Sequence, residues 1–121
     1  MIQDLTLLPD SLLTGIHDVL RYLGAAANYV GFFHTSYAVY LAVMQPDRLQ
    51  LVTKWLYPDV AKHYDTNWKA VERNIRYTVS SIWWQHPDRL SKLSGLLLPD
   101  KPCNSLFLTI LSDYCSHILF S

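Results

Sequence analysis

The chain has 121 residues, half of them apolar, and its ten basic and ten acidic side chains give it no formal net charge. This length fits one folded domain over residues 1–121, and the apolar share excludes an intrinsically disordered chain. A chain without net charge has no global field that attracts nucleic acid, so any basic surface has to be local.

The cysteines and histidines lack the spacing of a metal site or of a disulfide scaffold. Cys103 and Cys115 form no CxxC motif, and the five histidines never recur at three- or four-residue spacing. The N-terminus lacks the positively charged segment of a signal peptide. We therefore expect a reduced, cytoplasmic protein with no metal and no cofactor.

Apolar residues recur at helical spacing along most of the chain, and no long stretch alternates with period two. A first helix is predicted from Leu12 to Leu23, with Asp10 or Ser11 as its cap and Gly24 as its stop. Further helices and short apolar pieces follow at 28–44, 49–56, 58–63, 67–84, 90–98 and 105–119, with Asn104 or Ser105 capping the last. This pattern predicts an all-α fold of about six helices.

The segment 22–45 raises the question of a membrane span, because it contains no Asp, Glu, Lys or Arg. However, Gly24 and Gly31 weaken it as one helix, and four tyrosines, Asn28 and His34 interrupt its apolar character. Buried helices of small α-helical domains have the same hydropathy. We therefore expect buried helices and no membrane association.

Residues 58–84 have the layout of a helix-turn-helix. A short helix at 58–63 contains the small residue Ala61, and a polar turn at 64–66 leads into the long helix at 67–84. In a helix-turn-helix the second helix is the recognition helix, whose early outward residues face base edges in the major groove of DNA. We therefore predict that the helix at 67–84 is a recognition helix.

The predicted recognition helix carries a buried face and a basic face. Lys69, Arg73, Arg76 and Ser80 share one side, here called the basic stripe, and Glu72, the only glutamate of the chain, lies at its edge. The opposite side holds apolar residues: Trp68, Val71, Ile75, Val79 and Ile82.

A charged helix face is often no more than a solvent-exposed surface, but the charge order argues otherwise here. Lys69 with Arg73, and Arg73 with Arg76, are like-charge neighbours that each destabilise a helix by about 0.2–0.5 kcal/mol. Only the pair of Glu72 and Arg76 offsets this repulsion. The arrangement therefore indicates an external anion, and double-stranded DNA fits because arginine reads guanine and glutamate accepts from cytosine.

Several motifs resemble a known family. The stretch LYPDVAKHYDTNWKAVERNIRYTVSSIW, the later KPCNSLF and the earlier IHDVL are similar to the C-terminal effector domain of the sporulation master regulator, stage-zero sporulation protein A. The resemblance covers nearly the whole chain from about Leu12. It implies an all-α domain that binds a short DNA box through a helix-turn-helix. It also implies dimers on paired boxes and regulation of transcription through RNA polymerase and its sigma subunit.

The resemblance also implies roles for single residues. Glu72 and Arg73 match the base-reading residues of the family, and Arg76 matches a basic position on the same helix. We expect DNA-backbone or supporting roles for a group of neighbouring polar and basic residues: Lys62, Thr66, Asn67, Lys69 and Arg76.

Three departures from the family pattern are present. Ala70 stands where the family has a further arginine, so one base contact is missing and the preferred box is expected to differ. The family places a receiver domain ahead of this one, whereas only about ten residues precede the first predicted helix. The chain is therefore either a free-standing paralogue or a domain cut from a longer protein. The last helix ends apolar, which fits either a homodimer interface or an ordinary core helix.

Two function classes other than a DNA-binding regulator are a protein-interaction module and an enzyme. A protein-interaction module that pairs with a full-length regulator or with RNA polymerase is favoured by Ala70 and by the apolar stretches at 22–44 and near the C-terminus. An enzyme is not expected, since the sequence has no nucleophile–base pairing, no glycine-rich phosphate loop and no carboxylate pair, and hence no catalytic residues.

Overall fold

The computed structural model describes residues 8–26 and 29–120, which form helices and connecting segments without a β-strand. The elements in chain order are α1 (Leu8–Leu23), α2 (Val30–Met44), the 3-10 helix η1 (Pro46–Gln50), α3 (Val52–Trp55), α4 (Tyr57–His63), α5 (Trp68–Gln85), α6 (Pro87–Ser94) and α7 (Asn104–Phe120). Apart from the single-turn α3, the α-helices are the six longer ones, so the predicted all-α fold of about six helices is confirmed. No helix in the described ranges is long and apolar enough to cross a membrane.

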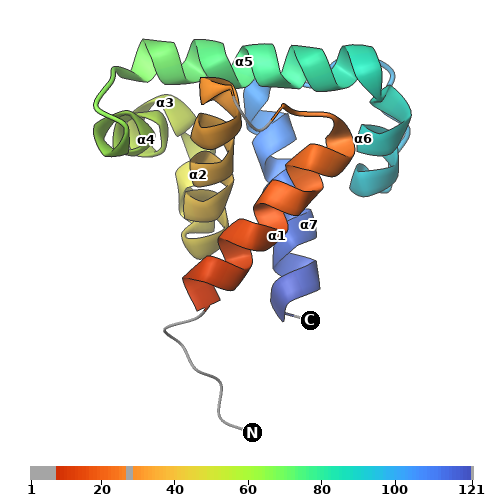
Figure 1. Cartoon of the computed structure of the whole chain (residues 1–121), viewed down its shortest axis with the longest axis horizontal. Helices are drawn as coiled ribbons and strands as arrows, with labels where there is room; N and C mark the ends of the chain where they lie inside the picture. The colour runs from red at the N-terminus through yellow and green to blue at the C-terminus, as the bar shows by residue number, and fades with distance from the viewer. Residues whose placement is uncertain (1–7, 27–28, 121) are drawn as a thin grey trace, which may run out of the picture.

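Helix α5 lies across one end of the molecule, and the other helices lie on one side of it (Figure 1). Helices α1, α2 and α7 run away from α5, while α4 lies near its beginning and α6 near its end (Figure 1). Helix α2 packs against α1, α5 and α7 and is therefore central. One long face of α5 consequently remains free of other helices (Figure 1).

The helix ends follow local chemistry. Gly24 and Gly95 adopt positive φ angles of 102° and 73°, in which a side chain is strained, and they follow the last residues of α1 and α6. Prolines stand in the first turn of η1, α4 and α6, where a missing N–H is tolerated.

Several boundaries differ from the predicted ones. Helix α1 begins at Leu8, so Asp10 and Ser11, predicted as its cap, lie inside the helix. The run at 49–56 is split between η1 and α3, and the piece at 90–98 is helical from Pro87 to Ser94 only. The last helix begins at Asn104, so the predicted cap at Asn104 or Ser105 is wrong and both residues lie inside the helix. The carbonyl of Cys103, just before it, accepts the N–H of Phe107. The predicted start of α2 at Asn28 lies outside the described residues.

The core joins residues of every long helix. Fully buried side chains include Leu12, Ile16 and Leu20 of α1 and Val60 of α4, together with Phe32, Val71, Ile75, Ile82, Leu90, Phe107, Leu108 and Leu111. The segment 22–45, which raised the membrane question, supplies much of this core through α2, where eight of fifteen residues are buried. Its apolar character therefore comes from burial within the protein.

Helices α2 and α5 approach each other closely at Gly31. A Cβ atom built on Gly31 would lie 2.8 Å from the main-chain oxygen of Asn74 and still closer to the hydroxyl of Thr78. Only a residue without a side chain allows this approach, because backbone cannot move aside as a flexible side chain can. Gly31 therefore sets how deeply α5 sits on α2.

We expect Gly31→Ala to lower the free energy of unfolding by about 1–3 kcal/mol, because the added methyl group forces α2 and α5 apart. Urea denaturation followed by circular dichroism would measure the change. Val30→Ala is the matched control, since Val30 is exposed and its truncation should change stability by no more than about 0.5 kcal/mol. Equal stability of Gly31→Ala and the wild type would contradict this description of the helix crossing.

Candidate nucleic-acid interface

Helices α4 and α5 form the helix-turn-helix, joined by residues 64–67. The main-chain N–H of Thr66 donates to the carbonyl of Ala61 at 2.9 Å, which folds the turn back onto α4. Asp65 takes the left-handed backbone conformation with φ of 55°, which aspartate adopts more easily than most residues. The predicted helix-turn-helix is therefore confirmed.

Asn67 is the N-cap of α5. Its side-chain oxygen accepts a hydrogen bond from the main-chain N–H of Ala70 at 2.9 Å and so satisfies one of the free N–H groups of the first turn. Sequence reasoning placed Asn67 among the residues that contact or support the DNA interface. In the structure its side chain caps α5, and this hydrogen bond fixes where the helix begins.

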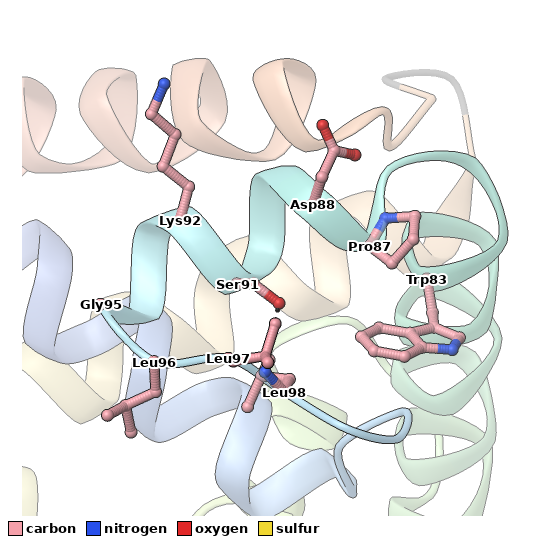
Figure 2. Close-up of a pocket in the computed structure, with 9 residues that line it drawn as sticks. All are labelled: Trp83, Pro87, Asp88, Ser91, Lys92, Gly95, Leu96, Leu97 and Leu98. Carbon is pink, nitrogen blue, oxygen red and sulfur yellow. Dashed lines mark hydrogen bonds between the residues drawn. The ribbon is translucent and has the colours of Figure 1, made fainter.

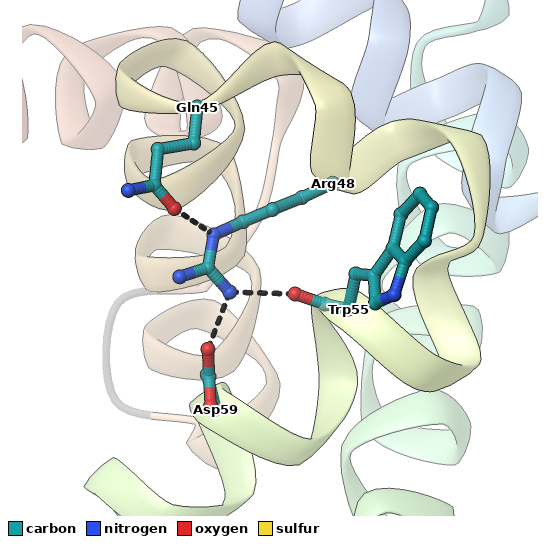
Figure 3. Close-up of polar contacts among 4 residues, drawn as sticks. All are labelled: Gln45, Arg48, Trp55 and Asp59. Atoms are coloured by element: carbon teal, nitrogen blue, oxygen red, sulfur yellow. Dashed lines mark hydrogen bonds and ion pairs between the residues drawn. The ribbon is translucent and has the colours of Figure 1, made fainter.

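Arg48 holds the beginning of α4 in place (Figure 3). Its guanidinium donates to the side chain of Gln45 at 2.7 Å, to the carbonyl of Trp55 and to the carboxylate of Asp59 (Figure 3). These partners belong to the residue that follows α2, to α3 and to the first turn of α4. The sequence offered no signal for this contact, since Arg48 and Asp59 are eleven residues apart and lie on different helices.

The basic stripe lies on the outer face of α5. The side chains of Lys69, Arg73 and Arg76 are exposed, Ser80 is half-buried, and Val71, Ile75, Val79 and Ile82 on the opposite face are buried. Lys62 and Thr66, before α5, are exposed as well. The expectation that Trp68 belongs to the buried face is wrong, because this side chain lies in the first turn of α5 and is 40% exposed. The ammonium of Lys69 lies over its ring, 5.9 Å from the ring centre.

Glu72 lies beside Arg76 as predicted from their spacing. Its carboxylate is 3.7 Å from Nε of Arg76, which is an ion pair longer than a hydrogen bond. The Glu72 side chain remains 35% exposed and that of Arg76 52% exposed. Among the described residues Arg73 forms no ion pair, so its guanidinium is available to an external partner.

Aromatic and histidine side chains of α2 contact α5, the end of α4 and the turn between these two helices. The Asn74 amide lies 3.4 Å from Nδ1 of buried His34, and desolvation lowers the pKa of His34 below its ordinary value. The neutral ring can therefore accept from the amide through Nδ1. Tyr37 stacks on His63 at the end of α4, with ring centres 4.0 Å apart. The hydroxyl of Tyr64 donates to the carbonyl of Phe33 at 3.3 Å.

The linker before α7 and the first residue of α7 also contact α5. The Asn104 amide donates to the main-chain carbonyl of Glu72 at 3.0 Å, and the Lys101 ammonium donates to the hydroxyl of Ser80 at 3.0 Å. Sequence reasoning missed both contacts, because their partners are 32 and 21 residues away and no local pattern joins them. Asn104 therefore supports the backbone that carries Glu72.

A helix-turn-helix whose second helix presents a row of cations to solvent defines the class of DNA-binding regulators. The chain matches the family described as Sporulation initiation factor Spo0A C terminal over residues 16–115, and it belongs to that family. This is a family of DNA-binding effector domains of transcription regulation in sporulation, and not a known family of enzymes.

We expect Asn67→Ala to lower the free energy of unfolding by about 0.5–2 kcal/mol, because the first turn of α5 loses its cap. Asn67→Ser should recover most of the loss, since a serine hydroxyl can accept the same N–H of Ala70. Urea denaturation of the three proteins would measure this. Unchanged stability of Asn67→Ala would mean that the cap contributes nothing to the helix.

Proposed function

We propose that this protein binds double-stranded DNA sequence-specifically and regulates transcription, with α5 as the recognition helix in the major groove. One observation carries the proposal: three exposed cations, Lys69, Arg73 and Arg76, lie on one face of a helix whose opposite face is locked in the core. A rigid helix that presents exposed cations along its first half is what major-groove recognition needs. Mutual repulsion of these cations is relieved when phosphates or bases bind them.

Within this surface we assign base reading to Glu72 and Arg73. Arg73 can donate two hydrogen bonds to one guanine, and the Glu72 carboxylate can accept from a cytosine amino group. The long separation between Glu72 and Arg76 supports this role, because the carboxylate keeps acceptor capacity for a base while Arg76 offsets its charge. We assign backbone contacts to Lys62, Thr66, Lys69 and Arg76, and the helix cap to Asn67.

Ala70 has consequences for the preferred DNA sequence. The residue is half-buried, close to the start of α5, and carries only a methyl group toward any ligand. A methyl group can contact thymine but cannot donate a hydrogen bond to guanine. We therefore propose a box that differs from the family's at the base pair next to those read by Glu72 and Arg73. Selection from random duplex DNA at a stated salt concentration would define it.

Arg73→Ala should weaken binding to the selected box by about 1–3 kcal/mol and relax the preference at one base pair, because a bidentate contact is lost. Lys69→Ala should weaken binding to all sequences alike and reduce the slope of log K against log salt by about 1, as expected for a phosphate contact. Mobility-shift titrations with the selected box and a scrambled duplex measure both effects. Unchanged affinity and sequence preference of Arg73→Ala would refute its assignment.

We also propose a homodimer formed through α7. The core uses Phe107, Leu108, Leu111 and Cys115 of this helix. A separate ridge at four-residue spacing is left partly uncovered: Leu106 (45% exposed), Ile110, Tyr114 and Ile118 (54% exposed). Such ridges pack against the grooves of a second helix, and a two-fold axis would pair this surface with itself. A dimer would place two recognition helices on paired DNA boxes.

Leu106→Arg should convert the dimer to a monomer in sedimentation experiments, because it places a charge in the proposed apolar contact. Leu97→Arg is the matched control: Leu97 is 90% exposed in the linker after α6, outside the ridge, so this variant should stay dimeric. A wild-type protein that sediments as a monomer both alone and on paired boxes would refute the dimer.

We further propose that the DNA-bound protein contacts RNA polymerase through its sigma subunit and that it is cytoplasmic, as expected of a transcription regulator. Transcription from a promoter that carries the selected box, with purified RNA polymerase, tests the polymerase contact. The alternative is an interaction module that pairs with a full-length regulator without reading DNA, which the exposed Leu96 and Leu97 favour. Co-purification with such a regulator, together with no shift of any duplex in the selection, would favour this alternative.

A further inference from the structure

The linker between α6 and α7 brings a fourth cation onto the outer face of α5. Lys101 is exposed, and its ammonium donates to the hydroxyl of Ser80 at 3.0 Å. Ser80 belongs to the basic stripe and lies one helical turn beyond Arg76. The charge of Lys101 therefore extends the row of Lys69, Arg73 and Arg76, although it comes from a distant part of the sequence.

The linker that carries Lys101 is fixed at both of its ends. Figure 2 shows Leu98 below Ser91 of α6, and the main-chain N–H of Leu98 donates to the Ser91 hydroxyl at 3.3 Å. After Lys101, Pro102 is buried and the Asn104 amide donates to the carbonyl of Glu72. A cation on an anchored linker loses less conformational entropy on binding than one on a free loop.

The bonding of Lys101 leaves it able to bind an anion. An ammonium has three donor hydrogens, and Ser80 takes one of them. Its partner is neutral, and in the described part of the chain no carboxylate lies within ion-pair distance of Lys101. The neighbouring Asp100 is exposed and forms none of the described ion pairs. The positive charge is thus held in place without being neutralised.

Helix geometry places this charge at the edge of a DNA groove. Ser80 follows Arg73 by seven residues, which is about 10 Å along a helix. A recognition helix holds its N-terminal residues at the base edges of the major groove, so a residue this much further along the helix lies beyond the base contacts and nearer to the phosphates that border the groove. Lysine binds phosphate as a compact point charge and reads no sequence.

We propose that the linker between α6 and α7 is a second DNA-contacting element, in which Lys101, positioned by Ser80, binds a backbone phosphate. This inference rests on the proposed function, since it requires α5 to lie in the major groove. The linker then contributes to DNA affinity in a way that does not depend on the DNA sequence.

The test measures binding of the selected box by wild type and Lys101→Ala over a range of salt concentrations. Lys101→Ala should lower the slope of log K against log salt by about 0.9, the value for one phosphate contact, and leave the preferred sequence unchanged. Lys101→Arg should restore the slope, because it keeps the charge. Ser80→Ala should weaken binding less than Lys101→Ala, since it removes the support but not the cation.

Lys92→Ala is the matched control, since Lys92 is an exposed lysine in the last turn of α6 (Figure 2). It removes the same charge from the protein and should leave the slope as in the wild type. If the wild type binds DNA and Lys101→Ala has the wild-type slope, or if Lys92→Ala lowers it equally, this inference is wrong while the proposed function stands. If the wild type binds no duplex, the proposed function fails and this inference fails with it.

Discussion

The packing of α5 on α2 is the contact on which the rest of the structure depends. Val71, Ile75, Val79 and Ile82 bury one face of α5, and Gly31 lets the two backbones approach closely. Because this face is buried in the core, the opposite face is exposed to solvent. The burial of the apolar face therefore sets the direction in which the charged residues of the basic stripe point. Burial of the apolar face supplies the stability that repulsion among the cations takes away.

Around this contact, smaller interactions decide where the helix-turn-helix begins and how it is braced. Asn67 fixes the first turn of α5, Arg48 fixes the first turn of α4, and Asn104 fixes the backbone at Glu72. Each is one or a few hydrogen bonds, worth little alone. Together they prepare the surface before any ligand arrives, so that little order has to be created on binding.

Positive charge is concentrated on one surface of the protein. The chain has no formal net charge, yet one face of α5 collects Lys69, Arg73 and Arg76 from its own sequence and Lys101 from the linker after α6. Because the net charge is zero, this face is locally positive and the rest of the protein carries the balancing negative charge, so an anion is attracted to this face alone. Glu72 sits at the edge of this face, paired loosely with Arg76, which suits a residue that is to accept a hydrogen bond rather than to cancel charge.

The all-α class, the helix-turn-helix and the two faces of α5 could be predicted from the sequence, because helical periodicity, caps and turns are properties of neighbouring residues. The same local rule failed for Trp68, which has the right spacing for the buried face but lies beyond the end of the core. Contacts such as Arg48 with Asp59, Asn74 with His34 and Lys101 with Ser80 join residues far apart in the chain. Only the tertiary structure decided them, since packing of the helices, and not any sequence pattern, sets which distant side chains meet.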